Sequence, residues 1–183
     1  LHWSAYVQKE ELVSGYDFPM DSRDGFVTGN LADHGMSAVR VDPDDGRAYF
    51  VTGGNLDLIS TPFSGAASFV LPFASGDALT SGDIDGDGED EIVAGNLGMD
   101  RLVVVCDPPS ATTVTFLGFD ADLEAWDAIA CGHLYDFWGK EAIVVARPVD
   151  GGTVDIYQYA DAGGAIGWHD SLDIPFSSND ALV

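Results

Sequence analysis

The feature that most constrains this fold is a sequence pattern that recurs about every fifty residues. Each copy has an aromatic residue or Met, a polar connector, and an aspartate followed by small and apolar residues. The copies are PMDSRDGFVTGN (19–30), PFASGDALTSGD (72–83), GFDADLEAWDAIACGH (118–133), which carries an insertion before its aspartate, and PFSSNDALV (175–183). The anchor aspartates are at positions 24, 77, 127 and 180, so the intervals are 53, 50 and 53 residues. Such a period is typical of stacked or radially arranged units.

Each unit contains about four short apolar segments, separated by clusters of Gly, Pro, Asp and Ser. In the second unit the segments are DALTSG, EIVAGN, DRLVVVCD and TTVTFLGF, and in the third they are DAIACG, EAIVVAR, GTVDIYQYA and SLDIPF. No segment keeps an apolar period of about 3.6 residues, so we expect almost no helix. Four short strands per unit, repeated radially, predict an all-β fold of the β-propeller kind.

The repeat also predicts how the chain is divided. We expect residues 1–183 to form one partial propeller domain. Its expected parts are a partial blade at 1–23, full blades at 24–76, 77–126 and 127–179, and the start of a further blade at 180–183. Propellers have about four to eight blades, so further blades or strands of other chains are expected to complete this one.

The charge of the chain limits its partners. The formal net charge is −24 at pH 7, with 31 acidic residues against seven Lys and Arg. Such a surface repels phosphate backbones and anionic membranes, which argues against nucleic-acid partners. No apolar run is long enough for a membrane helix, so no membrane insertion is expected. Two explanations of the acidity remain open: binding of divalent cations, and adaptation to solubility or high salt.

The two cysteines carry no motif. Cys106 and Cys131 lack the CxxC spacing of metal or redox sites. A disulfide and a pair of buried thiols are both compatible with the sequence.

The stretch SGDIDGDGEDEIVAGN (81–96) holds the densest cluster of acids. Counted from Asp83 as position 1, acids stand at Asp85 (3), Asp87 (5), Glu89 (7) and Glu91 (9). Alternate residues of a tight loop can direct oxygens at one centre, and the intervening glycines permit the turn. Hard oxygen ligands in a flexible loop favour Ca²⁺. An EF-hand is excluded because position 12 is Ala94 and a strand follows; a solvated acidic turn is the alternative.

GDIDGDGEDEIVAG, at a strand turn of a fifty-residue repeat, resembles the FG-GAP/VCBS repeat. That family forms β-propellers, including the headpiece propeller of integrin α subunits, and its D-x-D-x-D-G-x-x-[DE] loop binds Ca²⁺. The resemblance implies ligation by the side chains of Asp83, Asp85, Asp87 and Glu91 and by the carbonyl of Glu89. The Phe-Gly and Gly-Ala-Pro motifs of the family are absent, so the chain is nearer the VCBS type.

The other loops have lost the ligand pattern. GNLADHGMSAV (29–39), aligned without a gap, places Asn30, Ala32 and His34 at positions 1, 3 and 5. GHLYDFWGKEAI (132–143) has one inserted residue and offers His133, Tyr135 and Asp136. We expect no Ca²⁺ at either loop. DPDDG (42–46) is interpreted as a hairpin turn.

The sequence shows no catalytic constellation: GxSxG is absent and the histidines are scattered, so an enzyme is not expected. Trp126 and Trp138 stand where loops are predicted, and they are candidates for stacking on a glycan. Packing between blades is the alternative for both side chains.

The expected function is therefore a calcium-stabilised extracellular propeller, secreted or at the cell surface. It would act as an adhesion or interaction scaffold for a protein or glycan ligand, and extracellular modules bind Ca²⁺ with dissociation constants of about 10⁻⁴–10⁻³ M. The alternatives are the propeller of a secreted polysaccharide-degrading enzyme or lectin, and a structural subunit of an extracellular assembly.

Overall fold

In the described part of this chain, the regular secondary structure consists of β-strands. The computed structural model describes residues 4–5, 16–17, 22–31, 37–52, 68–106, 115–125, 127–134, 140–148, 152–159 and 166–174. No helix occurs in these segments, as the absence of a helical apolar period predicts. None of them therefore supplies a helix that could span a membrane.

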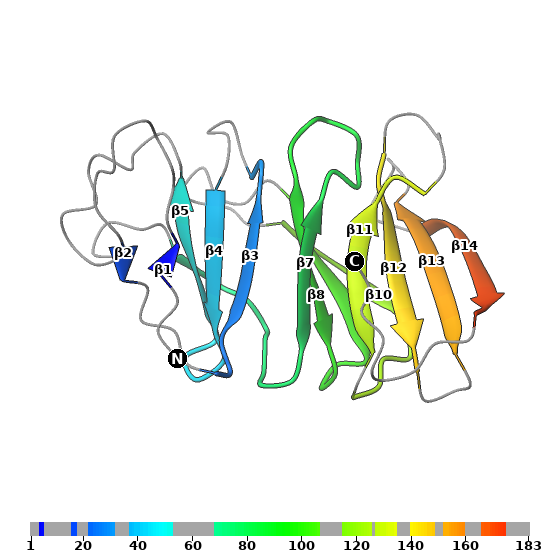
Figure 1. Cartoon of the computed structure of the whole chain (residues 1–183), viewed down its shortest axis with the longest axis horizontal. Coiled ribbons are helices and arrows are strands. Elements are labelled where there is room, and N and C mark those ends of the chain that lie inside the picture. The colour runs from blue at the N-terminus through cyan, green and yellow to red at the C-terminus, as the bar shows by residue number, and fades with distance from the viewer. Residues whose placement is uncertain are drawn as a thin grey trace.

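Three four-stranded antiparallel sheets follow one another along the chain, one for each predicted full repeat (Figure 1). The first contains β3 (Gly25–Gly29), β4 (Ser37–Asp42), β5 (Arg47–Thr52) and β6 (Ser68–Val70). The second contains β7 (Ala78–Gly82), β8 (Glu91–Asn96), β9 (Arg101–Cys106) and β10 (Thr115–Asp120). The third contains β11 (Ala128–Gly132), β12 (Ala142–Arg147), β13 (Thr153–Tyr159) and β14 (Ile166–Asp173). The all-β class is confirmed.

The segment before the first sheet contributes a short antiparallel pair. Its strands are β1 (Ser4–Ala5) and β2 (Tyr16–Asp17), and they lie within residues 1–23, where a partial blade is expected. The DPDDG segment forms the turn between β4 and β5, where Gly46 has a φ of 65°. Both features agree with the sequence-based expectation.

One strand differs from its prediction. SLDIPF (171–176) was the expected fourth strand of the third repeat, whereas β14 begins at Ile166. The reason is pairing: β14 follows nearly the whole of β13, and a register shift beside Gln158 and Tyr159 accommodates one extra residue. Trp168, which precedes the predicted segment, therefore pairs with Gln158 inside a strand.

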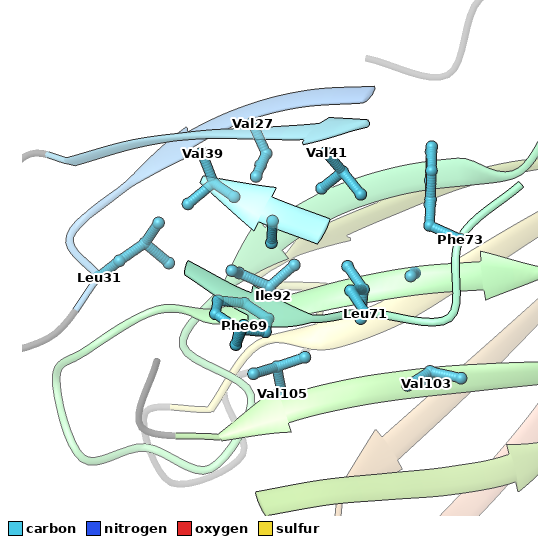
Figure 2. Close-up of a cluster of buried hydrophobic side chains, with 12 residues drawn as sticks. Val27, Leu31, Val39, Val41, Phe69, Leu71, Phe73, Ile92, Val103 and Val105 are labelled. Atoms are coloured by element: carbon cyan, nitrogen blue, oxygen red, sulfur yellow. The ribbon is translucent and has the colours of Figure 1, made fainter. Parts of the chain in front are cut away.

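The sheets pack face to face, with the first strands β3, β7 and β11 lying side by side in that order (Figure 1). Valines of the first sheet meet Ile92, Val103 and Val105 of the second in one apolar cluster (Figure 2). A second cluster joins the other face of the second sheet, at Val93 and Val104, to the third sheet. The alternation of side chains along each strand explains this: successive residues of β8 serve opposite faces, so all six are buried.

The third sheet has a further apolar cluster on the face turned away from the second sheet. Its members are Ala142, Val144, Ala146, Val154 and Ile156, all of which are buried. The third sheet is thus apolar on both faces, like the second, which is a property of a sheet in the interior of a stack.

The strand registers correct the alignment of the three loops between first and second strands. Gly29 pairs with Ser37, Gly82 with Glu91, and Gly132 with Ala142. The loops therefore span residues 30–36, 83–90 and 133–141, each one residue longer than the one before. The first loop needs a gap relative to the second, so Ser37, rather than Ala38, occupies the place of Glu91.

Candidate functional site

The acidic loop, residues 83–90, joins β7 to β8 at one end of the second sheet, with Glu91 as the first residue of β8. Its tight path depends on glycine: Gly86 and Gly88 have φ values of 85° and 96°, in the left-handed region. Other residues adopt these angles only with strain. The spacing D-x-D-G-D-G places the glycines where the chain reverses and leaves acids between them.

Backbone N–H groups hold the loop carboxylates in place. Asp83 accepts hydrogen bonds from the amides of Gly86 (2.7 Å) and Gly88 (3.0 Å), one on each carboxylate oxygen. Asp85 accepts one from the amide of Asp87 at 3.1 Å, and Asp87 accepts one from the amide of Glu89 at 2.8 Å. Each carboxylate oxygen has two lone pairs, so these bonds leave acceptor capacity for a cation.

Three of the predicted ligands converge. Asp83, Asp85 and Glu91 each present a carboxylate oxygen, and these oxygens lie within 4.8 Å of one another. Two oxygens on one Ca²⁺, each about 2.3–2.6 Å from the ion, can be at most about 5 Å apart. The donor set therefore fits a hard divalent cation. Asp87 lies outside this group, and ligation by the carbonyl of Glu89 stays a prediction.

Glu91 is the most unusual of the three because it is buried, with only 2% of its surface exposed. Burial raises the pKa of Glu91 to about 8, and the charges of Asp85 and Asp87 act in the same direction. A hydrogen bond of 3.0 Å from the amide of Ile84 opposes this shift. A cation beside Glu91 would favour the ionised carboxylate that burial disfavours.

The loop also contacts the sheets on either side. Toward the first sheet, Asn30 donates its amide to Asp90 at 2.7 Å, and its side chain donates to the carbonyl of Gly88 at 2.7 Å. In return, the amide of Asp90 donates to the carbonyl of Asn30 at 2.9 Å. Toward the third sheet, the carbonyl of Asp83 accepts the amide of Glu141 at 2.8 Å. The acidic loop, which belongs to the second sheet, is therefore hydrogen-bonded to the first and third sheets as well.

The residues that make these connections were not among the predicted site residues. Asp90 and Glu141 occupy equivalent places, immediately before the second strand of their sheets. An acid at that position in two repeats was the available signal, because the one-residue insertion in the third loop brings Glu141 into line with Asp90.

The first and third loops lack the ligand at the strand start. In the first sheet Ser37 occupies the place of Glu91, and its hydroxyl donates to the carbonyl of Leu31 at 3.2 Å. In the third sheet that place is taken by Ala142. His133 lies near Glu141, with 3.3 Å between Nδ1 and Oε1. Of the other residues named in these loops, Ala32, His34, Tyr135 and Asp136 lie outside the described residues.

The remaining sequence candidates have different outcomes. Trp126 and Trp138 both lie outside the described residues, so glycan stacking by either stays a prediction. Cys106 and Cys131 are not joined in a disulfide, which settles the alternative in favour of thiols. Burial raises the pKa of Cys131 above its usual range, so its thiol stays protonated at neutral pH.

Comparisons of this chain with protein-family models, with curated proteins and with solved structures gave no match.

Proposed function

We propose that this chain is a segment of a β-propeller of the FG-GAP/VCBS type, stabilised by Ca²⁺ in its one intact acidic loop. Support for the propeller comes from three sheets of four strands whose first strands β3, β7 and β11 lie side by side. In a propeller the first strands of successive blades surround a common axis, and the remaining strands run outward.

The calcium proposal rests on one observation: carboxylate oxygens of Asp83, Asp85 and Glu91 lie within 4.8 Å of one another. The loop that brings them together turns at glycines with positive φ. The cation's role is structural. It would offset the repulsion between the two aspartates and compensate the cost of a buried Glu91. Because the same loop contacts Asn30 and Glu141, the bound ion would also stiffen the packing of three neighbouring blades.

The scaffold would act outside the cell or at its surface, as an adhesion or interaction module for a protein or glycan. Such modules bind Ca²⁺ with dissociation constants of about 10⁻⁴–10⁻³ M, which suits extracellular calcium. The ligand-binding role rests on the resemblance to propeller repeats, while the loop chemistry supports the structural role of the ion.

Isothermal titration calorimetry of the chelator-treated protein tests the calcium proposal. Ca²⁺ should bind at one site, and Asp85→Asn should weaken it at least tenfold. Asp122→Asn is the matched control: it also removes one carboxylate charge, at an exposed residue whose φ of 45° asparagine tolerates. Equal binding by wild type and Asp85→Asn, or equal weakening in both variants, would contradict a defined site. Mg²⁺ titrated in a parallel arm distinguishes Ca²⁺ from hard divalent cations in general.

A further inference from the structure

Five peptide bonds of this chain join an aspartate to a glycine, at positions 24–25, 45–46, 85–86, 87–88 and 150–151. At such a bond the glycine nitrogen can attack the side-chain carboxyl group of the aspartate, because glycine has no Cβ to hinder closure of the five-membered ring. Whether the attack occurs in the folded protein depends on how the glycine amide is held. The structure describes both residues at the first four bonds, and the last bond lies outside the described residues.

The Asp24–Gly25 bond is held by the first sheet. Gly25 is the first residue of β3 and pairs with Val41 of β4. The Asp24 carboxylate is buried and accepts a hydrogen bond from Nε of Arg40 at 2.8 Å. A carboxylate in such an ion pair keeps its negative charge, and a carboxylate anion is a poor target for a nucleophile. Both partners of the reaction are therefore restrained at this bond.

The Asp45–Gly46 bond is held by the hairpin turn between β4 and β5. The Gly46 amide donates to the carbonyl of Asp42 at 2.9 Å. The Asp45 carboxylate accepts the amide of Arg47 at 2.9 Å on one oxygen and the hydroxyl of Tyr49 on the other. The glycine nitrogen is thus restrained by a main-chain hydrogen bond of a turn that closes two paired strands.

The two Asp-Gly bonds of the acidic loop are held differently. The amides of Gly86 and Gly88 donate to the two carboxylate oxygens of Asp83, at 2.7 and 3.0 Å. One side chain therefore restrains both nitrogens that could attack an aspartate, whereas the other two bonds are held by strand or hairpin backbone. A side chain can rotate away without breaking any strand pairing, so its restraint opens more readily.

Of the two loop aspartates, Asp87 is the better placed to react. Asp87 and Gly88 are both exposed, so water can leave the site and return to it. The Asp87 carboxylate accepts the amide of Glu89 at 2.8 Å. Because that amide lies two residues on, the carboxyl group is folded back toward the Gly88 nitrogen between them. Asp85, in contrast, belongs to the converging carboxylate group, in which a cation would keep it ionised.

We propose that the Asp87–Gly88 bond is a site of spontaneous isoaspartate formation, and that the hydrogen bond from the Gly88 amide to Asp83 restrains the reaction. The Gly88 nitrogen bonds to Cγ of Asp87, and the hydroxyl of the protonated carboxyl group leaves with the amide hydrogen as water. A second water then opens the cyclic imide. Cleavage at Cγ restores aspartate, and cleavage at the main-chain carbonyl gives isoaspartate, in which the chain runs through Cβ and Cγ. The reaction is a rearrangement, so it needs no oxidant or reductant.

The modification would alter the loop that the proposed function uses. Isoaspartate adds one atom to the main chain between Asp83 and Glu91, which contribute two of the three converging carboxylates. Reaction at this bond would therefore weaken Ca²⁺ binding, a consequence that rests on the proposed function. Isoaspartate formation itself depends on the hydrogen bonds of the loop and is measured in chelator, so either proposal can fail without the other.

Prolonged incubation of the folded protein in chelator, near neutral pH, tests the site. Isoaspartate is quantified by methylation with an isoaspartyl methyltransferase and assigned to a bond by mass spectrometry of peptides. In wild type it should accumulate at Asp87 and stay at background at Asp24 and Asp45. No isoaspartate at Asp87, or as much at Asp45 as at Asp87, would overturn the proposal, and this comparison requires no variant.

Two variants test the restraint by Asp83. Asp83→Ala releases the Gly88 amide from a charged acceptor and should raise the rate at Asp87 by about tenfold or more. The rate at Asp45, measured in the same molecules, should stay unchanged, which shows that the fold is intact. Asp85→Ala is the matched control, because it removes a neighbouring carboxylate and leaves the hydrogen bond from Gly88 to Asp83 in place. The rate at Asp87 should change little in this control.

The two variants also define the results that contradict the restraint. An equal rise in Asp83→Ala and Asp85→Ala would assign the effect to a loosened loop. An unchanged or slower rate in Asp83→Ala would mean that its carboxylate does not hold back the Gly88 nitrogen. Either result would overturn the proposal, and if the rate at Asp45 rises as well, the wild-type comparison alone decides.

Discussion

The junction between the first and second sheets and the junction between the second and third have the same packing but different chemistry at the loop. Leu31 and Ile84 are both fully buried, and an acid of the following sheet lies over Gly29 and Gly82 alike. At the start of the second strand, however, the first sheet has the neutral hydroxyl of Ser37, whereas the second has the buried carboxylate of Glu91. Apolar packing and backbone hydrogen bonds therefore set the geometry of the junction, and the acidic loop is added to it.

The largest effects should come from the apolar contacts that the junctions share. Leu31→Ala and Ile84→Ala should each lower the free energy of unfolding by about 2–5 kcal/mol, because each removes a fully buried side chain. Chemical denaturation in chelator measures both. Leu134→Ala is the control, because Leu134 is half exposed, and it should cost far less. A much smaller loss at Ile84 than at Leu31 would mean that the junctions are not equivalent.

The glycines that receive the acids should be next in size. Gly29→Ala and Gly82→Ala should each cost about 1–3 kcal/mol, since the packing must shift. The added methyl group overlaps the carboxylate of Asp90 at Gly29, and the carboxylate of Glu141 and the Cβ of Cys131 at Gly82. Denaturant titration of both variants gives the values. Unchanged stability in Gly82→Ala would show that the loop moves freely relative to the third sheet.

The chemical difference between the junctions should appear in the pH dependence. Glu91 has a usual pKa near 4.5 and a pKa of about 8 when folded without a cation, so between these values the folded protein holds a proton that the unfolded chain has released. The free energy of unfolding should therefore fall as the pH rises from about 4.5 to about 8. Glu91→Gln should flatten this fall.

Melting curves at several pH values in chelator, repeated with saturating Ca²⁺, test this expectation. Added Ca²⁺ should also reduce the fall in wild type, because the cation stabilises the ionised carboxylate. An equally steep fall in Glu91→Gln would assign the pH dependence to other groups, of which Glu141, whose pKa burial also raises, is the first to examine.

The smallest effect should come from the polar link between the acidic loop and the first sheet. Asn30→Ala removes the side-chain hydrogen bond to Gly88 and should cost about 0.5–1.5 kcal/mol, while the backbone bonds with Asp90 remain. Calorimetry should also show weaker Ca²⁺ binding, because Asn30 helps to order the carbonyl of Gly88. Unchanged affinity would restrict the site to the second sheet.

Much of the fold was predictable because the repeat is regular. The fifty-residue period and the short apolar segments predicted three units of four strands, and the structure has three such sheets. The fourth strand of the third unit was misplaced, since Gly163, Gly164 and Gly167 weaken a local strand pattern that pairing with β13 overrides.

The candidate site was predictable only in part. Alternation of acids and glycines identified Asp83, Asp85 and Glu91, and these are the three whose oxygens converge. Asp87 fits the same pattern but lies outside the group; its side chain is exposed and its carboxylate accepts the amide of Glu89. The places of Asp90 and Glu141 depend on contacts between sheets, which a local motif does not encode.

The sequence by itself determined the strand content, the period and the acidic loop, because these follow from side-chain alternation and turn chemistry within a few residues. Only the tertiary structure decided the loop alignment, the burial of Glu91 and the fit of Asp90 and Glu141 over glycines of the preceding sheet. These properties arise where residues about fifty or sixty positions apart meet, and the free energy of such contacts depends on the packing of whole sheets rather than on local propensity.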